Sequence, residues 1–518
     1  MAERAQPLSA TPGRAAAFVV AAVILGTLLA VAWRAEAGRG LGPSDWAALR
    51  FTLVQASLSA VLSVALGIPV ARALARRRFP GRRALIALLG APFILPVIVA
   101  ILGLLQIFGR SGWLSHLTVS LGLPPVQIYG LHGVVLAHVF FNLPLATRLI
   151  LQAWQEVPAE QFRLAAQLNL GPLAMIRLIE WPVLRRSCPG ALAVVFAICL
   201  TSFAVALTLG GGPRATTLEL AIYQAFRFDF DLGRAAMLSG IQLLLTGCTA
   251  LLALRLSRGD GFASGLDRAL QRWDGKSTLA KGLDTFWISL AALFLLLPLL
   301  AIVLAGVGGL TTLPSSVASA ALVSVATALG STVILLLLAL PMAAAVALGR
   351  GGLIELCGIL GLAASPLVIG TGLFILIRPV ADPFMLALPV TALVNAVMAL
   401  PFALRILVPQ ARSVVARYSR LALSLDMSHR SFATMVLLPR MRAQIGFAAG
   451  LAAALSMGDL GVIALFADAE MATLPLQIYR LMGAYRMQDA NAAALLLLIL
   501  SMAAFWLLDR GGRRHAEL

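Results

Sequence analysis

One acid, Asp459, lies inside a long apolar stretch of this chain, in the segment Leu-Ser-Met-Gly-Asp-Leu-Gly-Val-Ile that covers 455–463. An ionisable side chain in such a stretch is costly in lipid, so it often lines a polar pathway. It can equally sit at a helix interface and cap a helix break at Gly458 or Gly461. Asn142, two residues before Pro144 in another apolar stretch, allows either a pathway or a structural kink. Asp459 and Asn142 are therefore candidates for a pathway or gate.

No constellation that supports covalent or metal chemistry is visible in the sequence. There is no Ser-His-Asp arrangement, G-x-S-x-G elbow or carboxylate pair. His132 and His138 have no Cys, Asp or Glu at metal-ligand spacing, and none of the four cysteines forms a C-x-x-C pair. Gly275-Lys276-Ser277 resembles the end of a phosphate-binding loop, but Leu270 stands where that loop needs glycine. We expect neither an enzyme nor a cofactor or metal in this chain.

The elements that must position these residues are membrane helices. Of the 518 residues, 60% are hydrophobic and only 12% are charged, against about 25% charged in an ordinary soluble domain. Runs such as 15–33, 85–108, 285–310 and 314–348 contain no charge and reach the length that crosses a bilayer. Lipid-exposed backbone must satisfy its own hydrogen bonds, so these runs are helices. The fold class is therefore an all-α polytopic membrane protein.

The apolar pattern predicts about twelve transmembrane helices in two sets of six. The first set covers 15–33, 51–74, 84–108, 127–152, 188–209 and 234–255, and the second covers 285–308, 316–348, 353–377, 387–410, 443–467 and 489–508. The polar, glycine-containing stretch 256–284 is the predicted linker between a first half, 1–255 (core about 51–255), and a second half, 285–518 (core about 316–508).

Charge places the loops relative to the membrane. The loops after spans 2, 6 and 10 are rich in arginine and lysine, whereas 109–126 has one arginine and 309–315 has no charge. The positive-inside rule then puts both termini in the cytoplasm of a bacterial inner-membrane protein, with the loop 34–50 as an exception. The net charge of +18 follows this topology, so we expect contact with the lipid bilayer and no nucleic-acid partner.

The chain contains an internal repeat with a shift of 257 residues. Ungapped matches cross a charged loop: Leu143-Pro144 with Leu400-Pro401, Arg163-Leu164-Ala165 with Arg420-Leu421-Ala422, Leu168 with Leu425, and Pro182 with Pro439. The same shift pairs Ser202 with Asp459, which makes Ser202 a third pathway candidate. Six spans separate the copies, so the repeats are parallel, and a pathway is expected between the halves. Two equivalent cytoplasmic surfaces are expected as well.

The repeated cytoplasmic loops carry a family resemblance. They resemble the "EAA" loops of binding-protein-dependent ABC importer permeases of the MetI-like, type I fold, in which a glycine follows Glu by six residues and a proline follows that glycine by thirteen. Counted back from the two prolines, Asn169 and Asp426 take the glycine positions, and arginines take the Glu positions. Asn and Asp can adopt the left-handed turn of glycine. The implied ATPase-coupling residues are Arg163, Leu164, Ala165, Ala166, Leu168, Asn169, Gly171, Pro182, Arg420, Leu421, Ala422, Leu425, Asp426 and Pro439.

Within that family, three segments resemble the fused permeases of thiamine and thiamine pyrophosphate importers. They begin at Arg163, Leu209 and Leu455. The resemblance implies two copies of a separate cytoplasmic ATPase that holds ATP and Mg²⁺, and an extracytoplasmic binding protein that delivers the substrate. Fused ferric-iron permeases remain an alternative, as does a twelve-helix secondary transporter.

Overall fold

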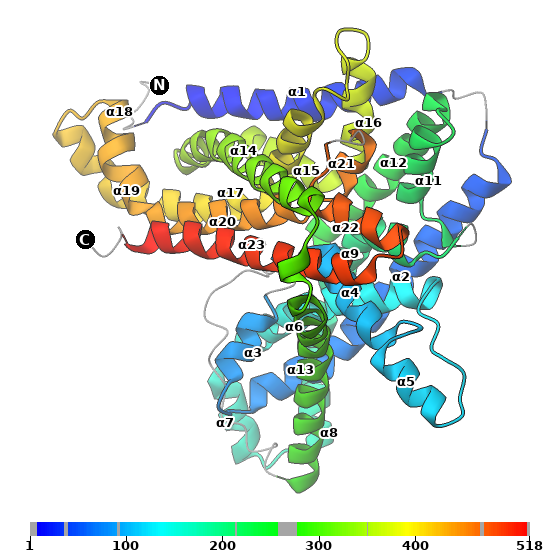
Figure 1. The fold of residues 1–518 in the computed structure, drawn as a ribbon. Coiled ribbons are helices and arrows are strands. Elements are labelled where there is room, and N and C mark those ends of the chain that lie inside the picture. Colours follow the sequence, from blue (N-terminus) through cyan, green and yellow to red (C-terminus); the bar gives the residue numbers. More distant parts are fainter. Residues whose placement is uncertain are drawn as a thin grey trace.

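A computed structural model describes residues 8–35, 40–90, 94–212, 215–256, 277–349, 351–466 and 471–514. Every regular element formed by these residues is a helix, and eleven helical stretches within them are long and apolar enough to cross a membrane. The all-α polytopic fold class is confirmed. Figure 1 shows the helices, coloured along the sequence from blue to red.

The described residues of the first half form thirteen helical elements. They are α1 (Thr11–Arg34), α2 (Pro43–Arg76), α3 (Arg82–Leu88), α4 (Val97–Phe108), α5 (Trp113–Ser120), α6 (Leu131–Gln155), α7 (Ala159–Gln167), α8 (Pro172–Met175), a π-helical turn η2 (Ile176–Glu180), α9 (Trp181–Leu200), α10 (Phe203–Leu209), α11 (Leu218–Arg227) and α12 (Leu232–Leu256).

The second half follows the linker, and its single helix α17 covers the repeat positions of α6 and α7. Its elements are α13 (Thr278–Val307), the short η5 (Leu310–Thr312), α14 (Ser315–Ala347), α15 (Gly352–Ala363), α16 (Pro366–Ile377), α17 (Ala387–Ser424), α18 (His429–Ser431), a π-helical turn η6 (Phe432–Leu437), α19 (Leu438–Arg440), α20 (Arg442–Met457), α21 (Gly461–Phe466), α22 (Leu474–Gly483) and α23 (Met487–Arg514). Matching helices pack alike: α2 against α6 and α9 corresponds to α14 against α17 and α20.

Eleven candidate spans among the described residues agree with the prediction of about twelve, but some of the predicted spans are broken. The predicted span 353–377 is split into α15 and α16, which are twelve residues each. At about 1.5 Å per residue, neither reaches across a hydrocarbon core of about 30 Å. The span 84–108 is divided into α3 and α4, and helices also break at 201–202 and at 458–460. Prolines explain the first two breaks, because Pro96 and Pro366 disfavour helical backbone in the preceding residue.

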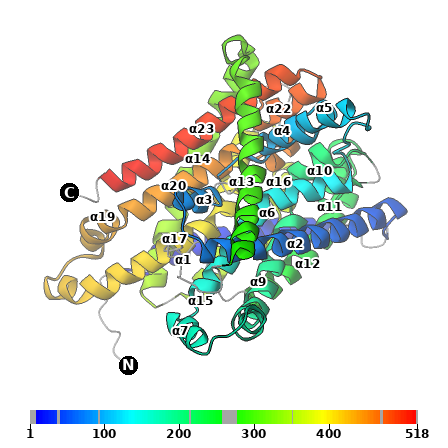
Figure 2. The ribbon, with the colours of Figure 1, turned by 90° about the horizontal axis from the view of Figure 1, so that it is seen from below.

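The first helix of each half packs on the opposite half. Helix α1 contacts α14, α15 and α16, and α13 contacts α2 and α4 (Figures 1 and 2). We call α1 and α13 the exchanged helices. Each of them lies against a glycine of the opposite half. A Cβ on Gly103 of α4 would overlap the carbonyl oxygen of Pro298 in α13, and a Cβ on Gly372 of α16 would overlap that of Thr27 in α1. Small residues allow such close helix contacts in membranes.

We expect Gly103→Val and Gly372→Val to destabilise the protein, because the added side chain collides with backbone of the exchanged helix. Overpacking of this kind costs about 1–3 kcal/mol. The melting temperature in detergent should fall for both variants. Gly26→Val is the control, because nothing lies within 4 Å of a Cβ at that position. Equal melting temperatures for all three variants would contradict the close packing.

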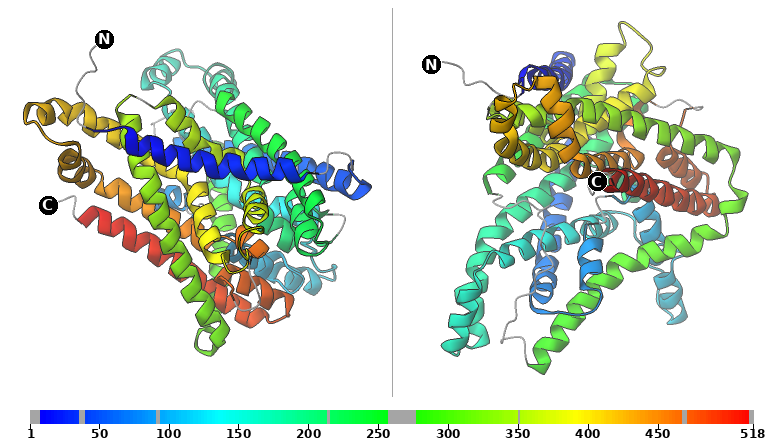
Figure 3. Two further views of the ribbon diagram at one scale, coloured as in Figure 1. Left: turned by 90° about the horizontal axis from the view of Figure 1, so that it is seen from above. Right: turned by 90° about the vertical axis from the view of Figure 1, so that its left-hand side faces the viewer.

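The described ends of the chain and the second repeated loop lie on one side of the molecule. The N-terminal end of α1, the C-terminal end of α23 and the elements α18 and α19 are together at the left of Figure 1, and two further views agree (Figure 3). Helices α7 and α8 of the first repeated loop lie well apart from α18 and α19. The predicted linker 256–284 falls mostly outside the described residues, and α13 already begins at Thr278.

Candidate functional site

A cavity of about 380 Å³ lies between the two halves. All four helix breaks reach it, through residues 94–97 before α4, 201–203 between α9 and α10, 366–367 at the start of α16, and 458–461 between α20 and α21. Broken helices are tolerated at membrane depth where they line a cavity or are buried in protein. The volume falls within the range of small-molecule sites.

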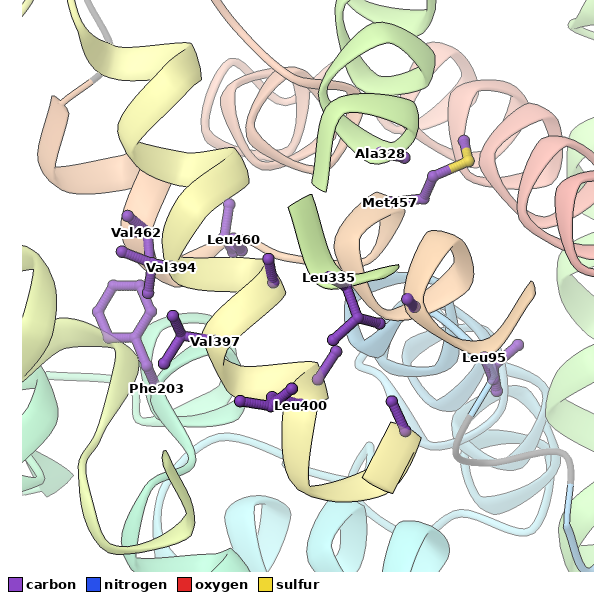
Figure 4. Packing of buried hydrophobic residues seen from close by; sticks show 14 of the residues in the cluster. Leu95, Phe203, Ala328, Leu335, Val394, Val397, Leu400, Met457, Leu460 and Val462 are labelled. Carbon is purple, nitrogen blue, oxygen red and sulfur yellow. The ribbon is translucent and has the colours of Figure 1, made fainter. Parts of the chain in front are cut away.

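Apolar packing fixes the walls of this cavity. Leu95, Phe203 and Leu460 line it and also belong to the buried hydrophobic core. Figure 4 shows Phe203 beside Val394 and Val462, where α10, α17 and α21 meet. Because protein interiors are close-packed, these side chains hold the helix ends in place.

Glutamine side chains satisfy the backbone at the first-half break. Gln55 of α2 donates to the carbonyl of Cys199 at 3.0 Å, and Gln242 of α12 donates to the carbonyl of Leu200 at 2.9 Å. These carbonyls are in the last turn of α9, where no intrahelical donor is available. The break between α9 and α10 is therefore stabilised by specific side-chain hydrogen bonds.

The three pathway candidates from the sequence all line this cavity: Asp459, Ser202 and Asn142. Ser202 occupies the break between α9 and α10, in the position that Asp459 occupies between α20 and α21. Asn142 donates to the carbonyl of His138 at 2.9 Å, within an unbroken α6. Their role in transport stays a prediction.

Asp459 combines the two interpretations left open by the sequence. Its Oδ1 accepts a hydrogen bond from the Gly461 amide at 3.1 Å, as a cap of α21 would. Its Oδ2 is buried and has no hydrogen-bond partner among the described residues. One oxygen therefore bonds to the start of α21, while the other is buried in the cavity wall.

A second acid in the cavity, Glu219 of α11, was missed by the sequence analysis. It is 1% exposed, its Oε1 accepts from Gln242 at 3.0 Å, and its Oε2 has no hydrogen-bond partner among the described residues. Helix α11, which has ten residues, is not one of the spanning stretches. The repeat match Thr217-Leu218 with Thr473-Leu474, directly beside it, was the available signal.

The repeated loops have the same backbone geometry. Asn169 and Asp426 adopt positive φ angles of 50° and 48°, which confirms the left-handed turn expected at these positions. The Leu170 amide donates to the carbonyl of Ala165, and the Met427 amide to that of Ala422, each at 3.0 Å. Each of these bonds is the outer hydrogen bond of a Schellman motif, in which a helix ends at a left-handed residue. Gly171 then precedes α8 as its N-cap.

Within each loop, the predicted coupling residues divide into a buried and an exposed set. Ala165 and Ala422 are only 2% and 3% exposed. Ala165 packs with Phe162 and Met175 in a small core of the loop itself. The role of the two alanines in ATPase coupling stays a prediction. The exposed residues are Arg163, Leu164, Ala166, Leu168, Asn169, Gly171, Pro182, Arg420, Leu421, Leu425 and Asp426.

The prolines of the two loops explain a shared distortion. Pro182 and Pro439 each follow a π-helical turn, η2 or η6. A proline inside a helix removes one hydrogen bond and clashes with a carbonyl one turn earlier, which a wider turn relieves. The helices leading into the membrane therefore begin near Pro172 and His429, before the predicted span starts at 188 and 443.

A buried ion network ties the first loop to the membrane helices. Glu180 of η2 accepts from Arg72 of α2 at 3.0 Å and from Arg76 at 3.3 Å. Asp284 of the exchanged α13 pairs with Arg77 at 2.7 Å and approaches Arg76 at 3.9 Å. The sequence analysis assigned these arginines to topology alone. In the structure they also link the loop, α2 and α13.

Together, two halves whose matching helices pack alike, a cavity between them and two repeated loops define a polytopic membrane permease. No family model matches the chain. It is 41% identical to the thiamine transport system permease protein ThiP of Escherichia coli over the full length of both chains. It is 40% identical to the protein of that name from Brucella abortus, over 98% of this chain and 95% of the relative. A probable sulfate transport system permease protein from Helicosporidium is 26% identical over 43% of this chain. The chain belongs to the family of thiamine transport system permease proteins.

Proposed function

We propose that this chain forms the membrane pathway of an ATP-driven importer for thiamine and its phosphate esters. The observation that carries the proposal is the identity of about 40% to thiamine permeases over essentially the whole chain. The cavity between the halves, with pathway residues from both repeats, supports it. A permease of this kind moves its substrate and catalyses no reaction.

Two copies of a cytoplasmic ATPase subunit bind ATP and Mg²⁺ and dock on the two repeated loops. Exposed leucines at equivalent positions, Leu164 and Leu421, support this arrangement, because such side chains suit a groove in a partner. Both chain termini then lie in the cytoplasm, on the side of the loops. A binding protein delivers substrate to the opposite face.

Movement of the loops couples ATP to the pathway. The loops lie apart in this structure (Figure 1). ATP binding closes the ATPase pair, brings the loops together and turns the cavity outward, and hydrolysis resets it. The ion network of Glu180 passes the movement of the first loop to α2 and α13.

Uptake of labelled thiamine tests the proposal. The chain is expressed with its ATPase and binding protein in bacteria that lack thiamine synthesis and uptake. We expect saturable uptake that unlabelled thiamine inhibits, and growth at low external thiamine. Cells with the two partners but without this chain are the control. Uptake no higher than in that control would overturn the proposed substrate.

A further inference from the structure

The two acids of the cavity come from opposite halves and are not repeated. Glu219 belongs to the first half, and its repeat position, shifted by 256 as in the flanking Thr-Leu match, is Pro475. Asp459 belongs to the second half, opposite Ser202. Both acids line the same cavity, and α11, which carries Glu219, packs against α21, which Asp459 caps. The cavity between the two repeated halves is therefore lined by two carboxyl groups that the repeat does not relate to each other.

Each carboxyl group has one oxygen committed to the fold and one left over. Glu219 Oε1 is held by Gln242 and Asp459 Oδ1 by the Gly461 amide, whereas Oε2 and Oδ2 are buried without a hydrogen-bond partner among the described residues. Leaving a buried acceptor unsatisfied costs about 1–3 kcal/mol, and more for a charged group. A positively charged ligand in the cavity, beside these oxygens, would offset part of that cost.

The rest of the described lining suits a flat organic cation. It contains neither lysine nor arginine, and its one other ionisable side chain is His138, whose Nδ1 lies 3.2 Å from Ser59 Oγ. Three rings, those of Phe141, Phe203 and Phe402, also line it. Aromatic faces attract cations, and more strongly when water is excluded.

We propose that this cavity is an intramembrane binding site for an aromatic cationic ring, with Glu219 and Asp459 as its counter-charges. The inference rests on the proposed function, because thiamine carries a permanent positive charge on its thiazolium ring. It adds a substrate site within the membrane and a preference there for the cationic ring system over neutral fragments of the same size.

Equilibrium binding of labelled thiamine to the full chain in lipid nanodiscs tests the site. We expect saturable binding by the wild type and a Kd at least about tenfold higher for Glu219→Gln and for Asp459→Asn, a loss of about 1.4 kcal/mol. Asp382→Asn, which changes an exposed acid outside the cavity, is the control and should bind normally. The uncharged aminopyrimidine fragment of thiamine should compete poorly with the wild type.

A carboxyl group placed at the equivalent position of the other half distinguishes a role in ligand binding from a role in folding. In the Asp459→Asn background, Ser202→Asp places a carboxyl at the equivalent break, and we expect it to restore part of the affinity. Asn caps helices as well as Asp does, so the melting temperature of Asp459→Asn should stay near that of the wild type. Weak binding with a large fall in melting temperature and no rescue would mark a structural role and overturn the proposal.

Binding and uptake fail in distinguishable ways. If cells take up thiamine but the purified chain does not bind it saturably, or the acid variants bind it with unchanged Kd, the cavity site is wrong and the proposed function stands. If cells with the complete system take up no thiamine, the proposed function falls, and the cavity proposal falls with it.

Discussion

A chain that carries Leu164→Asp and Leu421→Asp is expected to fold and insert but to lose its ATPase subunits. The two leucines occupy equivalent positions in the repeated loops and are 56% and 55% exposed. Their replacement therefore removes little packing within the permease. Docking would bury two unpaired carboxylates against the partner, at a cost of a few kcal/mol each. Co-purification of the ATPase should be abolished, and ATP-driven uptake should fall by more than about tenfold.

Two comparisons locate this effect in the docking surface. Leu123→Asp makes the same change at an equally exposed leucine outside the loops and should leave assembly intact. Ala165→Asp and Ala422→Asp place the charge on buried alanines, so they should lower the melting temperature of the permease alone. If the double leucine variant retains two ATPase copies, the exposed face of these helices is not the docking surface.

Glu180→Ala is expected to have the largest effect on stability. Glu180 is 3% exposed and pairs with Arg72 and Arg76, so its removal takes a shared carboxylate away from two arginines at a largely buried site. Breaking a buried ion pair from one side costs about 3–5 kcal/mol. The melting temperature should fall by several degrees, measured on the purified chain in detergent.

The matched control is Glu355→Ala, which removes a carboxylate from the exposed pair with Arg412. Exposed pairs contribute at most about 1 kcal/mol, so little change is expected. Equal melting temperatures for the two variants would show that the Glu180 network does not hold the first loop to α2 and α13.

Much of this architecture could be predicted because lipid imposes simple rules on sequence. Charge-free runs marked the spans, and the repeat shift of 257 paired the loops in register. The left-handed turns at Asn169 and Asp426 followed from their place thirteen residues before Pro182 and Pro439, where the resembling loops carry a glycine. In each case the signal was local, or was repeated within the chain.

The remaining features depend on tertiary contacts. The sequence of an apolar helix such as α1 does not indicate which half it packs against. The packing of α1 and α13 on the opposite half could therefore not be inferred from the sequence. Which alanine faces inward depends on how α7 folds over Phe162 and Met175. Glu219 lies outside the long apolar runs, and only the fold brings it beside the break that contains Asp459.

Reconstituted transport tests the central claim most directly. The chain is placed in liposomes with its ATPase, with binding protein and labelled thiamine on one side and ATP with Mg²⁺ on the other. We predict uptake that requires ATP and the ATPase, and none by the chain alone under a proton or sodium gradient. Gradient-driven thiamine uptake by the chain alone, unaffected by ATP, would identify a secondary transporter and contradict this account.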